Sequence, residues 1–283
     1  SHSRDGNGLG QLTSLEDERK LLIRLQTEVW DSIDNLCMSL KPDEWDITTD
    51  CPGWSVKDCI SHLIGIEHRL LGRQVTDHVP KNMKHVNNDL GLRNEIDVDL
   101  RRSCSINTIL EEFREVTSER KKILHRQQDF SEKAESPIGT GSIADLLSIR
   151  IFDCWIHEQD IRRAIRKPGN LSGNAAAHSF RRIDRTMPYI VGKKSKVGEG
   201  KSVEFIRTGY TANNFVVAVE SGRARVTEGD VSPTVSLSME CEDYLILTCG
   251  REHPNNLINS GRISISGDAY LGQSIVRQMN FMI

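Results

Sequence analysis

The sequence lacks any long hydrophobic run. Its longest apolar stretches, such as FVVAV at residues 215–219, are far shorter than the roughly 20 residues needed to cross a bilayer. The N-terminus also lacks the charged segment, apolar core and cleavage site of a secretory signal. We therefore expect a cytoplasmic protein without a membrane partner.

Charge of one sign is not in excess either. The 37 lysines and arginines and the 40 aspartates and glutamates leave a formal charge of −3, and both signs are spread along the chain. No basic surface for nucleic acid is therefore predicted. The seven cysteines include no CxxC pair of the kind that holds structural zinc, and their odd number favours reduced thiols. No GxSxG elbow, P-loop or dinucleotide fingerprint occurs.

The 283 residues are enough for two domains. After a lead-in over residues 1–10 that we expect to be flexible, apolar residues recur at helical spacing in four segments before residue 170. Ser14, Ser55 and Ser142 each precede an aspartate by three positions, the arrangement of a helix-capping pair. Four long helices favour an antiparallel bundle. The segments are 14–40, 55–72, 106–127 and 142–169.

The remaining segments have other patterns. Residues 73–104 are polar and weakly periodic, and so predict a long loop, a length that is usually functional. A helical piece follows at 172–190, and then short β-branched segments, SVEFIRTGY, NFVVAVES, RARVTEG and TVSLSME, predict an antiparallel sheet. CEDYLILTCG and DAYLGQSIVRQMNFMI are helical in pattern, with RISIS as a strand between them.

The predicted fold class is therefore a helical bundle followed by a small α+β domain with an antiparallel sheet. The corresponding ranges are a metal-binding bundle at 11–170, a helical connector at 171–202 and an α+β domain at 203–283.

The last bundle helix carries polar residues where apolar ones are expected. At about 100° per residue, His157 and Asp160 lie within about 40° of Asp153 on the helical wheel, in the middle of the apolar stripe. Burying an unpaired charge costs several kcal/mol, so these groups need partners inside the bundle. One interpretation is a hydrogen-bond network with Arg150 or Arg163. The other is a metal site, because two ligands one turn apart reach a single ion.

The second helix supplies further candidates. His62 lies at the edge of its apolar arc, and Glu67 lies in the centre. Glu67 is a candidate ligand, a partner of a ligating histidine or half of a buried ion pair, and the last two are favoured. His68 faces the polar side and is expected to be solvated. Cys51 and Cys59 lie nearby, and buried cysteines usually behave as small hydrophobes.

These stretches together resemble a known family. CPGWSVKDCISHLIGIEHRLLG (51–72), HVNNDLG (85–91) and IRIFDCWIHEQDIRRAIRKPG (149–169) resemble, in order, the bundle motifs of the mycothiol-dependent maleylpyruvate isomerase family, part of the DinB-like four-helix metalloproteins. YLILTCGRE and ISISGDAYLGQSIVRQMNF resemble its sterol-carrier-like C-terminal domain. The resemblance spans nearly the whole chain.

The resemblance implies a divalent metal, usually zinc, held by His62, Asp153 and His157. The carboxylate is glutamate in the characterised isomerase and aspartate here, one methylene shorter. Asp160 then orients His157 or an arginine. Three protein ligands leave open positions, as in a catalytic site. The thiol entering such a position would be mycothiol, which loses its proton and attacks an electrophilic carbon.

Three more residues are candidates for substrate or cofactor binding. Arg251, in the CGRE turn, is expected to bind a substrate or cofactor carboxylate in a bidentate contact, or else to be a surface arginine at a helix C-terminus. His85 and Asn88, in the 73–104 loop, are expected to hold the thiol cofactor or to belong to a gate.

Three functions fit these features. The first is a zinc-dependent and mycothiol-dependent isomerase or S-transferase acting on a small electrophile, as a monomer or homodimer. The second is a zinc hydrolase that uses metal-bound hydroxide, with Glu67 or Asp160 as the general base. The third is a non-catalytic module that binds a metal or another ligand. Retention of all three candidate ligands argues against the third.

Overall fold

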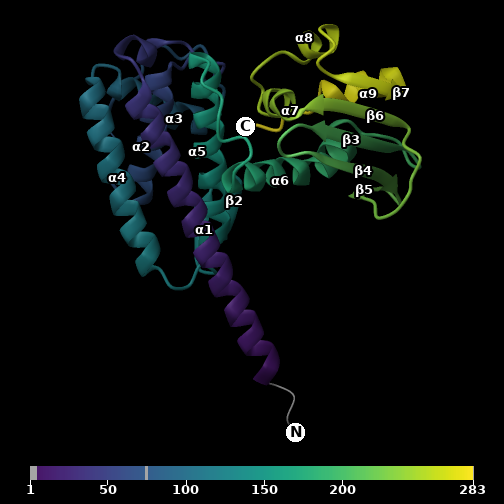
Figure 1. The fold of residues 1–283 in the computed structure, drawn as a ribbon, viewed down its shortest axis with the longest axis horizontal. Helices are drawn as coiled ribbons and strands as arrows, with labels where there is room; N and C mark the ends of the chain where they lie inside the picture. The colour runs from purple at the N-terminus through teal and green to yellow at the C-terminus, as the bar shows by residue number, and fades with distance from the viewer. Residues whose placement is uncertain (1–4, 74–75, 283) are drawn as a thin grey trace. The chain divides into compact units, whose positions relative to one another are not determined.

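The computed structural model describes the backbone of residues 5–73 and 76–282, and the side chains in these ranges from Ser14 onward. The chain divides into two compact units, one ending at Asn170 and the other beginning at Leu171 (Figure 1). The segment expected as a connector, 171–202, falls within the second unit. In the part of the chain that is described, no helix is long and apolar enough to cross a membrane.

The first unit is helical. Helices α1, α2, α4 and α5 pack in a closed ring, in which α1 and α2 each contact both α4 and α5, while α3 packs against α2 (Figure 1). Periodic apolar residues such as Val29, Ile33 and Leu63 are fully buried between them. The helices are α1 (Asp5–Ser39), α2 (Val56–Leu70), α3 (Asp89–Arg101), α4 (Ile106–Arg126) and α5 (Ile143–Ile165).

Two of the three predicted caps form. Ser55 and Asp58 exchange backbone-to-side-chain hydrogen bonds of 3.0 and 3.2 Å at the start of α2. Ser142 opens α5 in the same way. The prediction for Ser14 was wrong, because α1 begins at Asp5 and the backbone amides around Ser14 are already bonded within the helix. Of the expected flexible lead-in, residues 1–4 lie outside the described residues, and the backbone is helical from residue 5.

The stretch predicted as a loop, 73–104, contains the 13-residue helix α3. Its buried face holds one apolar side chain, Val98, beside the charged Glu95, Asp99 and Arg101. Because the buried residues are mostly charged, the helix lacks the hydrophobic period by which a helix is recognised in a sequence. The unpredicted hairpin of β1 (Lys133–Ser136) and β2 (Gly139–Ser142) is also polar.

The second unit packs helices against a five-stranded sheet of order β5-β4-β3-β6-β7. The prediction of an antiparallel sheet holds for three of the four strand pairs, whereas β3 and β6 are parallel. The chain between them forms the β4–β5 hairpin and then returns, and this long connection permits the parallel pairing. The strands are β3 (Ser202–Thr208), β4 (Asn213–Glu220), β5 (Arg223–Val226), β6 (Val235–Glu240) and β7 (Ser264–Gly267).

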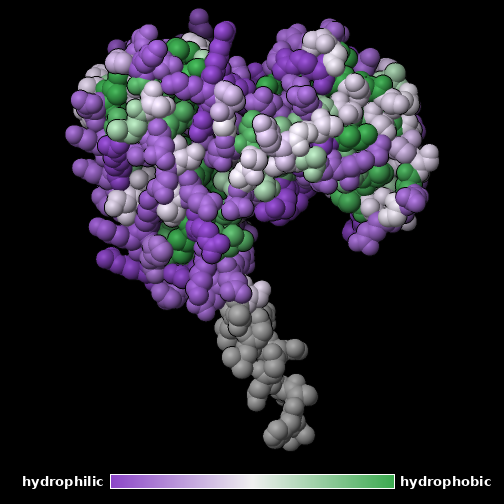
Figure 2. Space-filling view, viewed as in Figure 1, coloured by the Kyte–Doolittle hydropathy of each residue, from purple (hydrophilic) through white to green (hydrophobic). Residues whose placement is uncertain are grey.

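The helices of the second unit are shorter than those of the first. Both α7 and α9 contact β6 and bury residues such as Tyr244 and Ile275. The expected C-terminal helix ends at Val276, before Met279. On the face drawn in Figure 2, hydrophobic residues form small patches among hydrophilic ones. The helices are α6 (Asn174–Tyr189), which continues into a π-helical turn, α7 (Cys241–Thr248), α8 (Pro254–Asn259) and α9 (Ala269–Val276).

Candidate metal centre

Helices α2 and α5 bring His62, Asp153 and His157 together. His62 Nε2 lies 3.0 Å from Asp153 Oδ2, and His157 Nε2 lies 3.2 Å from Asp153 Oδ1. One donor atom from each residue lies within 4.8 Å of the others, the spacing of a group that could hold a metal ion. The two histidines are buried, and Asp153 keeps 17% of its side chain exposed. The cluster is therefore reachable from one side, that of the carboxylate.

The CPGW turn before α2 closes one wall of the cluster. The ring of Trp54 lies 4.8 Å from that of His62 and 5.7 Å from that of His157, centroid to centroid. The indole Nε1 donates a 2.8 Å hydrogen bond to Glu95 on α3. This bond and the two ring contacts fix the indole plane, so the turn holds both histidines against an apolar surface.

Asp160 holds the other ring nitrogen of His157. Its Oδ2 lies 3.1 Å from His157 Nδ1, and its Oδ1 accepts a 2.7 Å hydrogen bond from Arg163 Nη2. Arg163 in turn donates to Asp50. With Nδ1 bonded to a carboxylate, Nε2 is the nitrogen directed toward Asp153. Asp160 thus occupies the orienting position that the resemblance implies.

Glu67 forms a buried ion pair with two arginines. It lies 2.8 Å from Arg120 Nε and 3.0 Å from Arg150 Nε, and all three side chains are at most 9% exposed. Arg150 also donates a 2.6 Å hydrogen bond to Asp153 Oδ2. Of the interpretations considered for Glu67, the geometry supports the ion pair. The hydrogen-bond network of Arg150 and the cluster of candidate metal ligands therefore meet at Asp153.

Burial and charge shift the three pKa values in different directions. Burial alone would raise the pKa of Asp153, but the charges of His62, Arg150 and His157 hold it well below its usual range. Desolvation lowers the pKa of His62 to about 4, despite the opposing effect of Asp153. Desolvation also acts to lower the pKa of His157, but Asp153 and Asp160 outweigh it and raise the value. At neutral pH, the centre therefore contains a carboxylate and a neutral His62.

One nitrogen of the centre has no protein partner. His62 Nδ1 is buried and makes no hydrogen bond with any described residue. Buried polar atoms are nearly always satisfied, so such an atom indicates an absent ligand or water.

Cys51 was favoured as a hydrophobic residue, yet its sulfur forms a second group of possible ligand atoms with His157 and Asp160. In the sequence, only the position of Cys51 directly before the PGW turn indicated that it would lie near the candidate ligands.

The other predicted site residues lie elsewhere. His85 Nε2 lies 2.7 Å from Glu95, the carboxylate that also accepts from Trp54, so one residue connects His85 to the wall of the centre. The His85 ring would clash with a Cβ on Gly53, whose φ of +80° also requires glycine. Asn88 is exposed and caps α3 by accepting from Gly91 N.

His68 and Arg251 also have defined surroundings. His68 is half-buried and lies 3.1 Å from Glu112, so its predicted solvation was wrong. Arg251 belongs to the second unit, where its Nη1 donates to Cys249 O and its side chain lines a cavity of about 320 Å³ beside His253.

Comparison with known proteins assigns the chain. Residues 27–162, which include all three candidate ligands, match the family described as the mycothiol maleylpyruvate isomerase N-terminal domain. Residues 192–279 match the SCP-2 sterol transfer family. The helical unit carries a mycothiol maleylpyruvate isomerase N-terminal domain. The predicted resemblance is thereby confirmed.

Two solved structures share the fold of this chain. The crystal structure of the mycothiol-dependent maleylpyruvate isomerase is 16% identical, with a TM-score of 0.52, and the match covers 88% of this chain and 92% of that one. A histidine-to-alanine variant of that isomerase is 15% identical, with a TM-score of 0.51 and the same coverage. The search of curated proteins finds no match. The similarity confirms a helical region followed by a mixed domain rich in antiparallel strands.

Proposed function

We propose that the chain is a metal-dependent thiol enzyme, a mycothiol-dependent isomerase or S-transferase acting in the cytoplasm on a small electrophile. The observation that carries this proposal is the cluster of His62, Asp153 and His157 on α2 and α5. Two imidazoles and one carboxylate are a donor set typical of catalytic zinc. The buried, unpartnered Nδ1 of His62 and the partly exposed carboxylate also fit a site that takes up an ion and a small cosubstrate.

His62, Asp153 and His157 would hold the ion. A bound divalent metal such as zinc would supply positive charge, which lowers the pKa of a thiol brought beside it. Asp160 fixes the ring plane of His157 through Nδ1, and Arg150 anchors Asp153. Trp54 excludes water from one wall. Mycothiol bound beside this ion would supply a thiolate sulfur as the nucleophile for an electrophilic carbon of the substrate, which is the chemistry of an isomerase or an S-transferase.

The surroundings of two carboxylates favour thiol chemistry over hydrolysis. A hydrolase needs a general base within reach of its attacking water. Glu67 has both oxygens in ion pairs with arginines, and the two oxygens of Asp160 face His157 and Arg163. Because the oxygens of both carboxylates are engaged by other side chains, neither residue is placed to accept a proton from an attacking water.

The test combines metal analysis with a thiol titration. The purified protein, its His62→Ala variant and a control His125→Ala variant, altered at an exposed histidine on α4, are compared by elemental analysis. We expect about one divalent metal per chain in the wild type and the control, and loss of the metal in His62→Ala. The loaded protein is then titrated with mycothiol and with a simple thiol.

The two thiols separate the possible outcomes. Tight binding of mycothiol and weak binding of the simple thiol supports the proposal and justifies a screen of small electrophiles. Stoichiometric metal with no preference for mycothiol would contradict the mycothiol assignment. No stoichiometric metal in the wild type would exclude a metalloenzyme and favour the non-catalytic binding module.

A further inference from the structure

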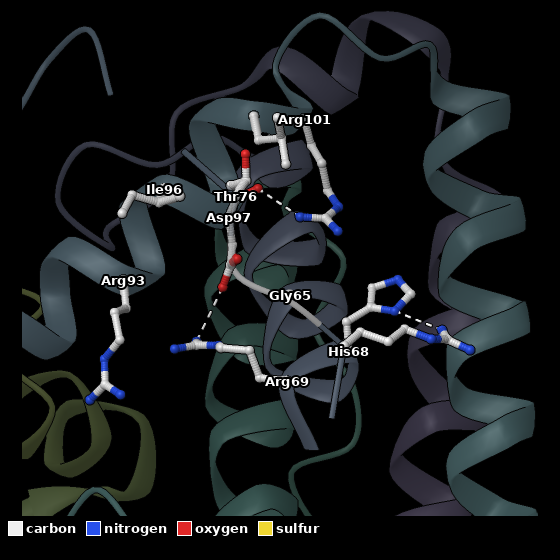
Figure 3. A pocket seen from close by; sticks show the side chains of 10 residues that line it. Gly65, His68, Arg69, Thr76, Arg93, Ile96, Asp97 and Arg101 are labelled. Atoms are coloured by element: carbon white, nitrogen blue, oxygen red, sulfur yellow. Dashed lines mark hydrogen bonds and ion pairs between the residues drawn. The ribbon is translucent and has the colours of Figure 1, made fainter. Parts of the chain in front are cut away.

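A second pocket lies in the helical unit, between α2 and α3. Its volume is about 250 Å³, and none of the three candidate metal ligands lines it. Figure 3 shows Arg69 and Gly65 on α2, with Arg93, Asp97 and Arg101 on α3. The fourth arginine of the lining, Arg73, comes from the chain after α2. Four arginines and one histidine thus line this pocket with a single carboxylate.

Two of the four arginines are neutralised by acids outside the pocket. Arg101 Nη2 lies 2.6 Å from Glu112, and Arg73 pairs with Glu119. The positive charges of the other two arginines are less completely balanced by acids. Arg69 shares the only carboxylate of the pocket, Asp97, at 3.1 Å, and the exposed Arg93 makes no ion pair or hydrogen bond with any described residue. Positive charge is therefore in excess beside Arg69 and Arg93.

Arg69 has an unused donor as well. Its Nη2 donates to Asn94, while its Nε is buried and has no hydrogen-bond partner among the described residues. A buried guanidinium N–H without an acceptor is costly, and a ligand oxygen would satisfy it. Burial lowers the pKa of Arg69 first of all, the charge of Asp97 opposes this, and the charge of Arg93 lowers the pKa further, so the two arginines lie within each other's field. An anion would stabilise both.

The backbone of α2 is shaped for this pocket. A Cβ on Gly65 would lie 2.4 Å from the Asp97 side chain, so only glycine allows α3 to bring Asp97 this close. Ile96 and the partly exposed Leu100 add apolar wall beside the arginines. A cationic end next to apolar side chains fits a ligand with an oxyanion joined to a short hydrocarbon.

We propose that this pocket binds a small oxyanion, held by the guanidinium groups of Arg69 and Arg93. Carboxylate and phosphate share the chemistry that arginine recognises, since both present oxygens to its planar N–H groups. Leu100 and Ile96 favour an organic carboxylate over inorganic phosphate. The lining of this pocket includes none of the three candidate metal ligands.

The test is a calorimetric titration of the purified full chain at low salt, with succinate and with inorganic phosphate as probes. Arg93→Gln is the decisive variant, because Arg93 is exposed and unpaired, so its loss leaves the fold intact. Arg126→Gln, at an exposed arginine on α4, is the matched control. We expect saturable binding of at least one probe to the wild type and the control, and at least tenfold weaker binding to Arg93→Gln with an unchanged melting temperature.

The same titration on His62→Ala separates this proposal from the metal centre. Binding retained in His62→Ala supports a distinct oxyanion site, whether or not that variant has lost metal. Succinate binding more tightly identifies a carboxylate ligand, and phosphate binding more tightly identifies a phosphate ligand. The proposal is overturned if neither probe saturates, if Arg93→Gln binds like the wild type, or if binding disappears with His62.

Discussion

Asp153 Oδ1 lies 3.2 Å from His157 Nε2, one turn further along α5. The other oxygen of the same carboxylate faces His62 at 3.0 Å and Arg150 at 2.6 Å. One aspartate therefore contacts both histidines and Arg150, which in turn pairs with Glu67. The charge balance of the helical unit and its candidate ligand set depend on the same carboxylate.

Replacing His157 by alanine should abolish metal binding and lower the melting temperature. The substitution removes one of three candidate ligands. It also takes a partner from Asp160 and a positive neighbour from Asp153. Elemental analysis and thermal unfolding measure the two effects. The exposed His125→Ala variant should match the wild type in both, and unchanged metal content in His157→Ala would refute the assignment.

Asp153→Glu should retain part of the metal, whereas Asp153→Asn should lose most of it. Glutamate keeps the charge and adds one methylene, so the ligand set is preserved with altered geometry. Asparagine removes the charge that compensates Arg150 and a bound cation. Metal stoichiometry and affinity of the two variants provide the comparison. Equal retention of metal in both would show that the carboxylate is not a ligand.

Glu67→Gln should destabilise the protein by about 3–5 kcal/mol, because it leaves Arg120 and Arg150 buried without their shared counter-charge. The metal content of the folded fraction should stay near that of the wild type, since Glu67 contacts arginines and not the candidate ligands. Urea unfolding and elemental analysis distinguish the two roles. Loss of metal with normal stability would instead make Glu67 a ligand.

Asp160→Asn should weaken metal affinity by about 10–100-fold without removing the site. The amide loses the charge that orients His157 Nδ1 and pairs with Arg163. Competition with a chelator measures the affinity. An affinity equal to that of the wild type would show that the orientation of His157 does not depend on this carboxylate.

Acid should destabilise the metal-free protein through His62. Its folded pKa of about 4 lies below the value of about 6.5 for an unfolded histidine. The unfolded chain therefore binds the proton first, and stability present above about pH 6.5 is lost as the pH falls toward 4. The effect of His157 on stability has the opposite pH dependence, because folding raises its pKa. Its contribution to the free energy of unfolding is complete below about pH 6.5 and declines as the pH rises through the pKa of the folded state.

Denaturant unfolding at pH 5 and pH 7 tests whether His62 makes the folded state less stable at acidic pH. Metal-free wild type should lose more free energy of unfolding between pH 7 and pH 5 than metal-free His62→Gln, which has no imidazole at that position. An equal loss in the two proteins would mean that His62 is not the buried group responsible.

The helices with a clear apolar period were predictable, and so was the face of α5 that Asp153 and His157 share. The capping serines Ser55 and Ser142 and the stripe around Asp153 depend on local spacing, which a sequence states directly. Helix α3 could not be predicted in the same way. Its buried Glu95 and Asp99 are stabilised by Trp54, His85 and His78 from other segments, together with Arg102 at the end of the helix itself.

The sequence alone determined that α5 places Asp153, His157 and Asp160 on one buried face, because 3.6 residues per turn fixes which side chains share a face. It did not determine their partners. Only the packing of α2 against both α4 and α5 decided that Glu67 pairs with two arginines and that His62 completes the cluster. These contacts join residues 53–91 positions apart, and such pairings depend on how helices meet in space, which local spacing does not encode.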